Sequence, residues 1–581
     1  MSNVTTRIRG FSTDTRARLA RLLQQKLEES KKKQTFDGEY DVVILGGGLA
    51  GSTLAIQLKQ ERPEISILVV EKRQHPVPEA AFKVGESTIE LGSHYLRDVL
   101  GLAKHLETYQ LPKAGLRYFF PAGDNSDITQ RIELGATMIL PVSTHQLDRG
   151  SFENMLREKN MELGVTFWHG CKASEVSFGA SQHVVTLNRD DEQLTVSTRW
   201  VVDASGRRGM LKRKLGLVQN VGHDASAVWF RIDEPIDIGS WSEDERWCAH
   251  VPSGLRRLST NHLMGRGYWV WLIPLPSGAT SVGIVADPRL HPHNKMNRFE
   301  RAMEWLYQHE PQCAKMIDQK RDHVLDFRAL KHYAHGCEQL FSAQRWCLTG
   351  EAGVFVDPFY SVGTDFIGLS NSFIKELVLR DLDGLDIQVH AEQFNRLYLD
   401  TFNSYIGTYE KQYPLMGNAQ VMSAKVIWDF SIYWGVNALL FFHKKSYDLQ
   451  FLRSVADPLR RFDNLNVCMQ AFFREWDQLG QQEWASTFIN YMNINFIDDL
   501  HHGLEAGLND EKLKDQVFQN IDLLETIAGG IFQYALDQLS QIFDEESKSN
   551  TIRRWQANGF FSLKKEVSKE VHYDLNKIWF D

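Results

Sequence analysis

Three glycines near the start of the chain have the spacing of a nucleotide-binding turn. The segment "GGGLAG" places Gly46, Gly48 and Gly51 directly after the apolar run 42–45 and at the opening of a predicted helix. Such glycines allow a tight turn and a close approach of the backbone to a pyrophosphate, which the positive end of the helix stabilises. Glu71 ends the next apolar run, where a carboxylate can accept hydrogen bonds from a ribose. These four residues predict a dinucleotide site.

A second feature is the pair Trp269 and Trp271 in "GYWVWLIPLPSG". In an extended segment, residues two apart point to the same face, so both indoles line one surface while Val270 and Leu272 line the other. Aromatic residues favour strands, and the "PSG" turn followed by "TSVGIVAD" is typical of a hairpin. By itself, this spacing indicates the core of a sheet.

The elements around these residues indicate an α/β core followed by a helical region. The apolar runs 42–45 and 65–70 are typical of buried parallel strands joined by a helix. Further strands are predicted at "VVDASG", between 225 and 290, and at "WCLTGEAG". From about Thr364 the pattern is almost wholly helical, with a break at "YPLMGN".

The predicted fold is therefore a Rossmann-like α/β domain with an inserted mixed or antiparallel sheet, followed by a mostly α-helical C-terminal domain. Residues 1–38 form a helical extension and linker, which is either solvated or docks onto a partner. Residues 39–370 form the nucleotide-binding domain, with inserted segments at about 90–150 and 220–330. Residues 371–581 form the helical domain.

Composition narrows the classes of function. The 581 residues carry a net charge of −9, which argues against general nucleic-acid binding. The six cysteines are scattered without CxxC spacing or histidine partners, so no metal site is predicted and the thiols are expected to be reduced. The apolar run 426–442 contains Asp429, Ser431 and Asn437, and predicts a buried helix or a tunnel wall instead of a membrane span. With no secretory signal, a cytoplasmic location is expected.

Three further segments carry a resemblance to a known superfamily. "VVDASGRRGML", "CLTGEAGVF" and "LDRGSFENML" are similar to cofactor segments of FAD-dependent monooxygenases of the hydroxybenzoate-hydroxylase type. The resemblance implies FAD as the dinucleotide, with Asp203, Gly350 and Arg149 among the cofactor-binding residues. That superfamily usually has an aspartate where this chain has Glu351, which is longer by one methylene and can accept the same hydroxyl bond.

Two more motifs resemble one branch of that superfamily, the flavin-dependent halogenases. A WxWxIP segment is matched by Trp269, Trp271, Ile273 and Pro274. An FxxPxxSxG loop is matched by Phe355, Pro358, Ser361 and Gly363. Because both motifs occur in the correct order after the flavin segments, a sheet core alone no longer explains the tryptophans.

The resemblance implies an enzyme that uses reduced FAD (FADH2), O2 and chloride or bromide to form hypohalous acid near the flavin. It implies that Trp269 and Trp271 keep the substrate away from the flavin. It further implies that backbone amides of Val362 and Gly363, beside Ser361, hold the halide, since successive amides after a tight turn can bind an anion. A tunnel then leads to the substrate.

The family also requires a lysine at the substrate end of the tunnel, because a poorly solvated amine is nucleophilic. Lys113 in "YQLPKAGLRYFF" resembles the surroundings of that lysine in halogenases of pyrroles and phenols. Lys83 is the rival candidate, but the adjacent Gly85, Glu86 and Ser87 resemble the family's flavin-side loop, which places Lys83 nearer the cofactor. A solvated surface lysine is the third alternative.

One departure from the family bears on the substrate. Tryptophan halogenases carry a glutamate just before the loop serine, where this chain has Tyr360. This difference argues against free tryptophan and favours an electron-rich phenol, resorcinol or pyrrole, either free or tethered to an acyl or peptidyl carrier protein. His145 is a weaker candidate for a base, because a lone histidine is more often structural.

The sequence leaves three functions open. No second glycine fingerprint for a nicotinamide cofactor is found, so the leading hypothesis is a halogenase of specialised metabolism that receives reduced FAD from a separate flavin reductase. The second hypothesis is an aromatic hydroxylase that uses NAD(P)H directly. The third is a non-catalytic FAD-bearing partner of an assembly line, docked through residues 1–38.

Overall fold

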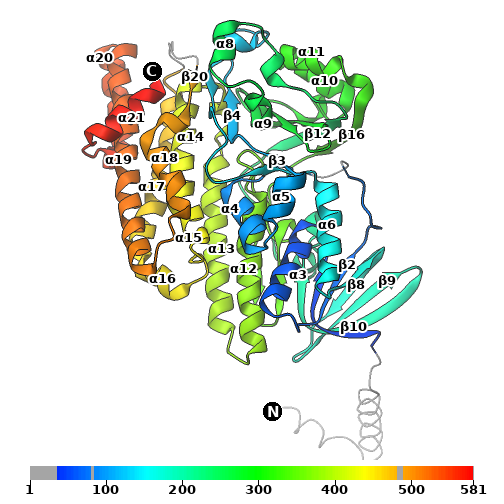
Figure 1. Ribbon diagram of the computed structural model, residues 1–581. Coiled ribbons are helices and arrows are strands. Elements are labelled where there is room, and N and C mark those ends of the chain that lie inside the picture. The colour runs from blue at the N-terminus through cyan, green and yellow to red at the C-terminus, as the bar shows by residue number, and fades with distance from the viewer. Residues whose placement is uncertain (1–35, 80–83, 481–487, 580–581) are drawn as a thin grey trace, which may run out of the picture.

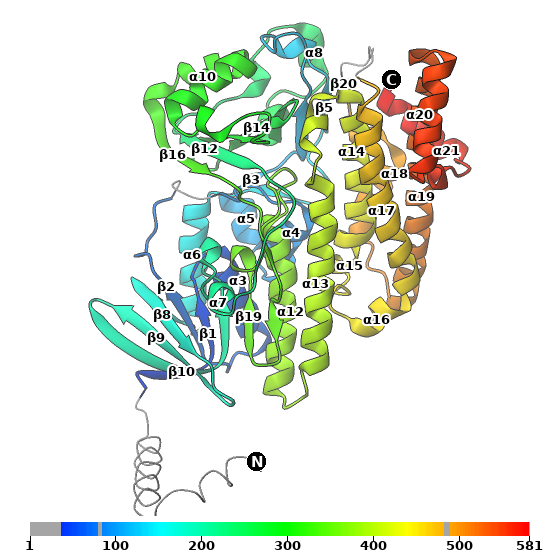
Figure 2. The same ribbon diagram turned by 180° about the vertical axis from the view of Figure 1, so that it is seen from behind.

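The computed structural model describes residues 36–79, 84–480 and 488–579 (Figure 1). The predicted N-terminal helix and Lys83 lie outside these ranges. In Figure 1 the main sheet, built mostly of blue and cyan strands, lies below a second and mostly green sheet, and the yellow-green to red helices stand along one side. The turned view in Figure 2 shows the same three parts.

The main sheet has eight strands: β1 (Gly38–Leu45), β2 (Ile67–Glu71), β7 (Thr166–His169), β8 (Cys171–Ser177), β9 (His183–Arg189), β10 (Glu192–Asp203), β18 (Phe341–Ser342) and β19 (Trp346–Leu348). The central order is β18-β19-β10-β1-β2-β7, and β9 pairs with β10 and β8. From β19 to β7 the strands run parallel. Val42 to Ile44 are fully buried because parallel strands are covered on both faces.

The register of the main sheet brings four chain segments to one edge. Leu45 lies beside both Val70 and Asp203, and Asp203 lies beside Leu348. Because these strands are parallel, the turns that follow them all leave from the carboxyl edge of the sheet, where α/β proteins bind their ligands. Helix α3 (Leu49–Glu61) starts there and packs against α6 (Arg149–Glu162) and α12 (Gly363–Leu382).

The second sheet also has eight strands: in spatial order β16 (Val324–Leu330), β12 (Ser226–Ile232), β15 (Thr280–Ala286), β14 (Tyr268–Pro274), β13 (Thr260–Gly265), β4 (Leu116–Phe119), β5 (Glu133–Leu134) and β20 (Phe488–Ile489). Its pairs are antiparallel except β13 with β4 and β20 with β5. The sheet is thus mixed, as predicted, and a strand from the helical region closes one edge.

The predicted alternation along β14 is present. Trp269, Trp271 and Ile273 belong to the large core shared with the main sheet and the helices. Val270 and Leu272 belong to a separate core under α10 (Phe299–His309) and α11 (Pro311–Asp318). The two indoles therefore face the interior of the molecule instead of the outer helical layer.

The C-terminal part is helical, as predicted. After α12 follow α13 (Gln388–Tyr409), α14 (Ala419–Ile432), α15 (Leu439–Phe442), α16 (Leu449–Ser454), α17 (Ala456–Asp477), α18 (Asn495–His502), α19 (Asp510–Ile542), α20 (Glu545–Ala557) and α21 (Lys569–Trp579). The break at "YPLMGN" is the short 3-10 helix η8 (Tyr413–Gly417). The apolar run 426–442 continues from α14 through the π-helical turn η9 (Tyr433–Ala438) into α15, and it is almost wholly buried.

Short elements connect these parts: α4 (Glu90–His94), α5 (Ala103–Tyr109), α7 (Met210–Lys214), α8 (Glu245–Ala249), α9 (Leu255–Leu258), and the two-stranded pairs β3 (Leu111–Pro112) with β6 (His145–Gln146) and β11 (Val218–Gln219) with β17 (Gly336–Cys337). Within the described ranges, no helix combines the length and the apolar character that crossing a bilayer requires. The six cysteines are unpaired, with Cys248 exposed. The predicted fold class is confirmed.

Candidate active site

A cavity of about 490 Å³ lies at the carboxyl edge of the main sheet. Most of the predicted cofactor residues line it: Gly46, Gly48, Glu71, Gly85, Glu86, Ser87, Arg149, Gly350, Glu351 and Gly363. The predicted Trp269, Trp271 and Ser361 line the same cavity. Residues from both sheets and from α12 thus share one large site, which we call the flavin cavity.

The glycine turn has the geometry that a pyrophosphate requires. Gly46 has a φ of +123°, and a Cβ there would lie 2.3 Å from the carbonyl oxygen of Ala204. A Cβ on Gly51 would lie 2.0 Å from the oxygen of Gly46, so this glycine permits close packing of α3 on the turn and does not itself line the cavity. By contrast, a Cβ on Gly48 would meet nothing nearer than Glu153 Oε1 at 4.0 Å. Space for phosphate oxygens is therefore left beside Gly48, at the N-terminus of α3.

Glu71 lies beside the glycine turn, at the end of β2. Its Oε2 accepts a hydrogen bond from the N–H of Gly47 at 2.9 Å, and its Oε1 accepts one from the N–H of Arg73 at 2.8 Å. The carboxylate is thereby fixed beside the glycine turn at the end of β2, with further lone pairs available. The cavity, the open side at Gly48 and this carboxylate together fit the adenosine half of FAD.

Arginine side chains supply positive charge to the flavin cavity. Arg149 donates to the carbonyl oxygens of Val84 and Gly85 at 2.7 and 3.1 Å, and to Glu153 Oε1 at 2.8 Å. Burial lowers the pKa of Arg149 to about 10, so the side chain stays charged at neutral pH. Arg149 therefore fixes the flavin-side loop that contains Gly85.

Two acids of the flavin cavity are held by arginines. Glu86 Oε1 lies 2.7 Å from Arg231 Nε, and Arg231 also pairs with Asp326 at 2.6 Å. Burial raises the pKa of Glu86, and Arg231 opposes that effect. Glu351 lies 3.9 Å from Arg207, and burial raises its pKa against the influence of Arg207.

Asp203 is placed at the same edge but does not line the cavity. Its Oδ1 accepts from the N–H of Ser205 at 2.9 Å, and its Oδ2 accepts from the N–H of Leu211 at 2.7 Å. Both oxygens are thus used to shape the turn after β10. Asp203 acts through the backbone of that turn, where Ser205 and Arg207 do line the cavity.

The tryptophan pair forms one wall of the flavin cavity. The ring centroids of Trp269 and Trp271 are 5.6 Å apart, and Phe359 lies 5.3 Å from Trp269 in an edge-to-face contact. Trp269 Nε1 donates to the hydroxyl of Tyr413 and Trp271 Nε1 to the hydroxyl of Ser281, each at 3.2 Å. Both indoles are therefore held in orientation by hydrogen bonds as well as by packing.

The loop that matches FxxPxxSxG is fixed by a buried carboxylate. Asp357 Oδ2 accepts hydrogen bonds from the hydroxyls of Tyr333 and Tyr413 at 2.5 and 2.8 Å and lies 2.6 Å from His223 Nε2. Its Oδ1 accepts from the N–H of Phe359 at 2.9 Å. Tyr413 also holds Trp269, so one network links the loop to the tryptophan wall.

The end of this loop separates the flavin cavity from a second one. Ser361 has a φ of +63°, a conformation that residues other than glycine rarely adopt, and α12 begins two residues later at Gly363. The first N–H groups of a helix have no acceptor within the helix. Ser361 and Gly363 line the flavin cavity, whereas Val362 lines the second cavity. The peptide between Val362 and Gly363 therefore lies at the boundary, where helix α12 favours an anion.

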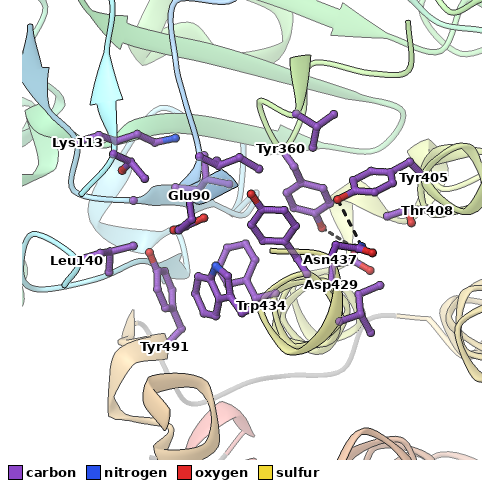
Figure 3. Close-up of a pocket in the computed structure, with 18 of the residues that line it drawn as sticks. Glu90, Lys113, Leu140, Tyr360, Tyr405, Thr408, Asp429, Trp434, Asn437 and Tyr491 are labelled. Carbon is purple, nitrogen blue, oxygen red and sulfur yellow. Dashed lines mark hydrogen bonds between the residues drawn. The ribbon is translucent and has the colours of Figure 1, made fainter. Parts of the chain in front are cut away.

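The second cavity, of about 50 Å³, lies between the second sheet and the helical region (Figure 3). We call it the lysine cavity because Lys113 lines it. Its other walls come from α4, the loop before α12, α13, the run 426–442 and Tyr491. The run 426–442 is a buried helical segment, as predicted, and it also lines this cavity.

Lys113 is 1 % exposed and has two fixed hydrogen bonds. Its Nζ donates to Ser87 Oγ at 2.9 Å and to the carbonyl oxygen of Thr88 at 2.8 Å. Burial lowers the pKa of Lys113 to about 7, although the charges of Glu90 and Asp365 favour the ammonium form. A substantial share of this lysine is therefore the neutral, nucleophilic amine near neutral pH.

Two other residues singled out in the sequence, Tyr360 for its departure from the tryptophan halogenases and His145 as a candidate base, are engaged in contacts within the protein. Tyr360 lines the lysine cavity, but its hydroxyl donates to Asp429 Oδ2 at 2.6 Å. His145 lines neither cavity, and its Nδ1 lies 3.3 Å from Ser93 Oγ. Burial lowers the pKa of His145 to about 4, so the ring is neutral at physiological pH.

Comparison with known proteins agrees with this geometry. Residues 39–282 match a family model described as FAD binding domain. The flavin-dependent halogenase chlA of Dictyostelium discoideum is 26% identical over 433 residues, which cover 68% of this chain and 70% of that protein. The 1H-pyrrole-2-carbonyl-(peptidyl-carrier protein) brominase of Pseudoalteromonas luteoviolacea (strain 2ta16) is 27% identical over 354 residues, or 60% of this chain and 79% of that protein.

The chain is similar in sequence to flavin-dependent halogenases. Among solved structures, the halogenase PltM superposes with a TM-score of 0.60 at 17% identity, covering 84% of this chain and 96% of that chain. The flavin-dependent brominase Bmp2 superposes with a TM-score of 0.51 at 20% identity, covering 76% and 98%. At these identities the superpositions establish a shared fold. The similarity to flavin-dependent halogenases, inferred above from motifs, is confirmed.

Several residues that line or support the two cavities were not predicted from the sequence. Asp357 lies within the segment that matches FxxPxxSxG, so its position in the motif could have indicated that it belongs to the site. Thr260 and His262 lie on β13, beside the tryptophan strand, and both line the flavin cavity. Glu90 and Tyr491 line the lysine cavity, and no local pattern marks either of them.

Proposed function

We propose that this protein is a halogenase that uses reduced FAD, O2 and chloride or bromide to halogenate an electron-rich aromatic ring of the phenol, resorcinol or pyrrole type. The observation that carries the proposal is the position of Lys113. Its nitrogen is bonded to Ser87, which lines the flavin cavity, while Lys113 itself lines the lysine cavity. A nucleophilic amine between two cavities suits the transfer of an oxidised halogen from one to the other.

The residues of the flavin cavity fit FAD. Gly46 and Gly48 would hold the pyrophosphate at α3, with Gly51 packing that helix onto the turn, while Glu71 would hold the ribose, and Arg149 and Glu351 the far half of the cofactor. When bound in reduced form, FAD would supply the reaction with O2 that oxidises the halide to hypohalous acid. In this proposal, amides of Val362 and Gly363 next to Ser361 position the halide.

The protein's own side chains would separate the two reactions. Trp269 and Trp271, held by Tyr413 and Ser281, would keep the aromatic substrate out of the flavin cavity and so prevent its hydroxylation. Lys113 would then hold hypohalous acid by a hydrogen bond or as a haloamine, in reach of a ring in the lysine cavity. The helical region would exclude water there, because its side chains form most of the walls.

Two partners belong to the proposal. A flavin reductase would supply reduced FAD, since the chain has one glycine fingerprint of this type. The aromatic substrate would be free or tethered to a carrier protein; the bacterial relative named above acts, by its name, on a pyrrole attached to a peptidyl carrier protein.

The deciding experiment incubates the protein with a flavin reductase, NADH, FAD, O2 and either chloride or bromide. A panel of phenols, resorcinols and pyrroles, free and carrier-bound, would be examined by mass spectrometry. Products with the chlorine or bromine isotope pattern support the proposal. Hydroxylated products that need NADPH but neither halide nor reductase would instead establish the aromatic hydroxylase, and the absence of any oxygen-dependent product would favour a non-catalytic FAD-bearing partner.

A further inference from the structure

Among the described residues, two carboxylates, Glu90 and Asp429, line the lysine cavity, and they differ in how they are paired. Asp429 Oδ2 accepts from the hydroxyl of Tyr360 at 2.6 Å and from Lys425 Nζ at 2.7 Å, and Oδ1 accepts from Gln470 Nε2 at 2.8 Å. Its charge is balanced by Lys425, and both oxygens are used. Asp429 therefore stabilises the wall and has little capacity left for a ligand.

Glu90 is equally buried, 4 % exposed, but is held far more loosely. The imidazole of His501 lies beside it, with Nε2 3.4 Å from Glu90 Oε1 but without the alignment of a hydrogen bond. Burial raises the pKa of Glu90, but His501, a backbone N–H and the indole of Trp434 outweigh burial and keep the pKa below its ordinary value. The carboxylate is therefore charged at neutral pH, with acceptor capacity facing the cavity.

Two side chains beside Glu90 make no regular hydrogen bond. Within the described ranges, Trp434 Nε1 and both ring nitrogens of His501 are buried without a hydrogen-bond partner, although the indole and the imidazole both act on the Glu90 carboxylate. Buried polar groups are nearly always paired in proteins, so a polar group of a ligand in this cavity, which Trp434 lines, would complete the pairing beside Glu90. Figure 3 shows the Glu90 carboxylate between Lys113 on one side and Trp434 and Tyr491 on the other.

The remaining walls suit an aromatic ring. Phe430 lies 5.0 Å from Trp434 and 5.2 Å from Tyr491, measured between ring centroids, and Leu140 lines the same space. Aromatic side chains at such distances form faces and edges against which another ring packs. A ring held there would have Glu90 and Lys113 as neighbours, while the charge of Asp429 is balanced by Lys425.

We propose that Glu90 accepts a hydrogen bond from a donor on the substrate ring, a phenolic O–H or a pyrrole N–H, and thereby selects the substrate and turns its reactive carbon toward Lys113. This inference rests on the proposed function. A hydrogen bond to a negative carboxylate increases electron density on the ring, and the same charge stabilises the positive charge that develops there during substitution. Glu90 thus supplies a carboxylate in a cavity where Tyr360 stands in place of the glutamate of tryptophan halogenases.

The chemistry balances without another reactant. A ring C–H and hypohalous acid give a ring carbon–halogen bond and water: the oxygen–halogen bond breaks, the carbon–halogen bond forms, and the ring carbon loses its proton. Hypohalous acid is the product of the proposed flavin reaction. Glu90 keeps its hydrogen bond throughout, so the ring donor is not consumed.

The test measures binding first, so that it does not depend on halogenation. The full-length protein and Glu90→Gln are titrated by calorimetry with phenol and anisole, and with pyrrole-2-carboxamide and its N-methyl derivative. In the wild type, methylation of the donor should weaken binding at least about 10-fold, the effect of a charged hydrogen bond. Glu90→Gln should remove most of that preference while binding of the methylated compounds stays within about 2-fold.

The control is Ser404→Ala, which changes another polar group of the same cavity and should keep the preference. Should Glu90→Gln fold poorly, as judged by circular dichroism, Glu90→Asp serves instead, because it withdraws the carboxylate by one methylene. Loss of preference in the phenol pair assigns the hydroxyl, and loss in the pyrrole pair assigns the N–H. Equal binding of both members of both pairs to the wild type would overturn the inference.

Halogenation is then measured with the better ligand of each pair. A wild type that prefers the free donor but yields no halogenated product would contradict the proposed function and leave the role of Glu90 in binding standing. A wild type that halogenates the donor compounds and the methylated compounds equally would support the proposed function and contradict the role of Glu90.

Discussion

The amine nitrogen of Lys113 lies 2.9 Å from the hydroxyl oxygen of Ser87, and these two residues line different cavities. Ser87 follows the flavin-side loop Gly85–Glu86, which Arg149 holds through backbone carbonyls. The contact is therefore a direct link between the place where a cofactor would bind and the place where a substrate would bind. Several expectations depend on it.

Replacing Lys113 should uncouple the two cavities. In Lys113→Met, which keeps the volume of the stem, halogenated product should fall at least about 100-fold, because the nucleophilic amine is lost. FAD binding should stay within about 2-fold, since Lys113 does not line the flavin cavity. Product is measured by mass spectrometry and hypohalous acid by a diffusible thioether trap. The exposed Lys104 provides the control variant Lys104→Met; retained halogenation in Lys113→Met would refute the assignment.

The rate of halogenation should depend on the protonation of Lys113. Its pKa is lowered to about 7, so the neutral amine increases as the pH rises from about 6 to 8, and the rate should increase with it. The charge of Glu90 favours the ammonium form, and the pKa of Glu90 lies below its ordinary value, so this carboxylate is charged throughout that range. In Glu90→Gln the rise should therefore move to lower pH. A flat profile between pH 6 and 8 in single-turnover measurements would contradict this expectation.

Lys113 should also make stability depend on pH. Its folded pKa lies below the unfolded value, so the unfolded chain binds more protons between pH 7 and 10.5 and stability rises with pH across that window. Lys113→Met removes this dependence. Relative to the wild type, the variant should gain on the order of 3 kcal/mol as the pH falls from about 10 to 7, measured by urea unfolding at several pH values. An unchanged difference between the two proteins would speak against a buried, perturbed lysine.

Two glycines of the nucleotide turn should respond differently to alanine. Gly51→Ala places a Cβ 2.0 Å from the oxygen of Gly46 and should destabilise the fold by about 2 kcal/mol or more. Gly48→Ala meets no atom within 4 Å other than Glu153 Oε1, so the fold should tolerate it. It fills the cavity side of the turn, however, and should weaken FAD binding at least about 10-fold in a fluorescence titration. Equal effects of both variants on stability would show that the turn is not built as described.

The hydroxyl of Tyr413 should stabilise the tryptophan wall. Tyr413→Phe removes a hydrogen bond to Asp357 and leaves the N–H of Trp269 without its acceptor. The expected loss is about 1–3 kcal/mol in the free energy of unfolding. Tyr307→Phe is the matched control, because that hydroxyl bonds Asp318 at an exposed position. A similar loss of stability in both variants would contradict the inference that the buried hydrogen bonds of Tyr413 stabilise the tryptophan wall.

Local patterns in the sequence predicted the backbone of both motifs. The glycine spacing after an apolar run predicts a turn and a helix start because φ and close packing at Gly46 and Gly51 exclude a Cβ. The alternation at Trp269 and Trp271 predicts a shared face because successive strand residues point to opposite sides. The helical character after Thr364 follows from apolar spacing in the same way. Each of these predictions depends on neighbours within a few residues.

The tertiary structure alone decided which side chains share a cavity. Asp429 lies 69 residues from Tyr360, and Tyr491 comes from a segment beyond α17, yet both line the cavity of Lys113. The two-residue strand β20 pairs with β5 across most of the chain, and no periodicity can indicate so short a strand. Contacts between residues so far apart in sequence depend on how whole helices pack against the sheets. That packing is stabilised by many weak contacts, which no local pattern in the sequence shows. For that reason Lys113 could be named from its motif, whereas Glu90 became visible only beside it.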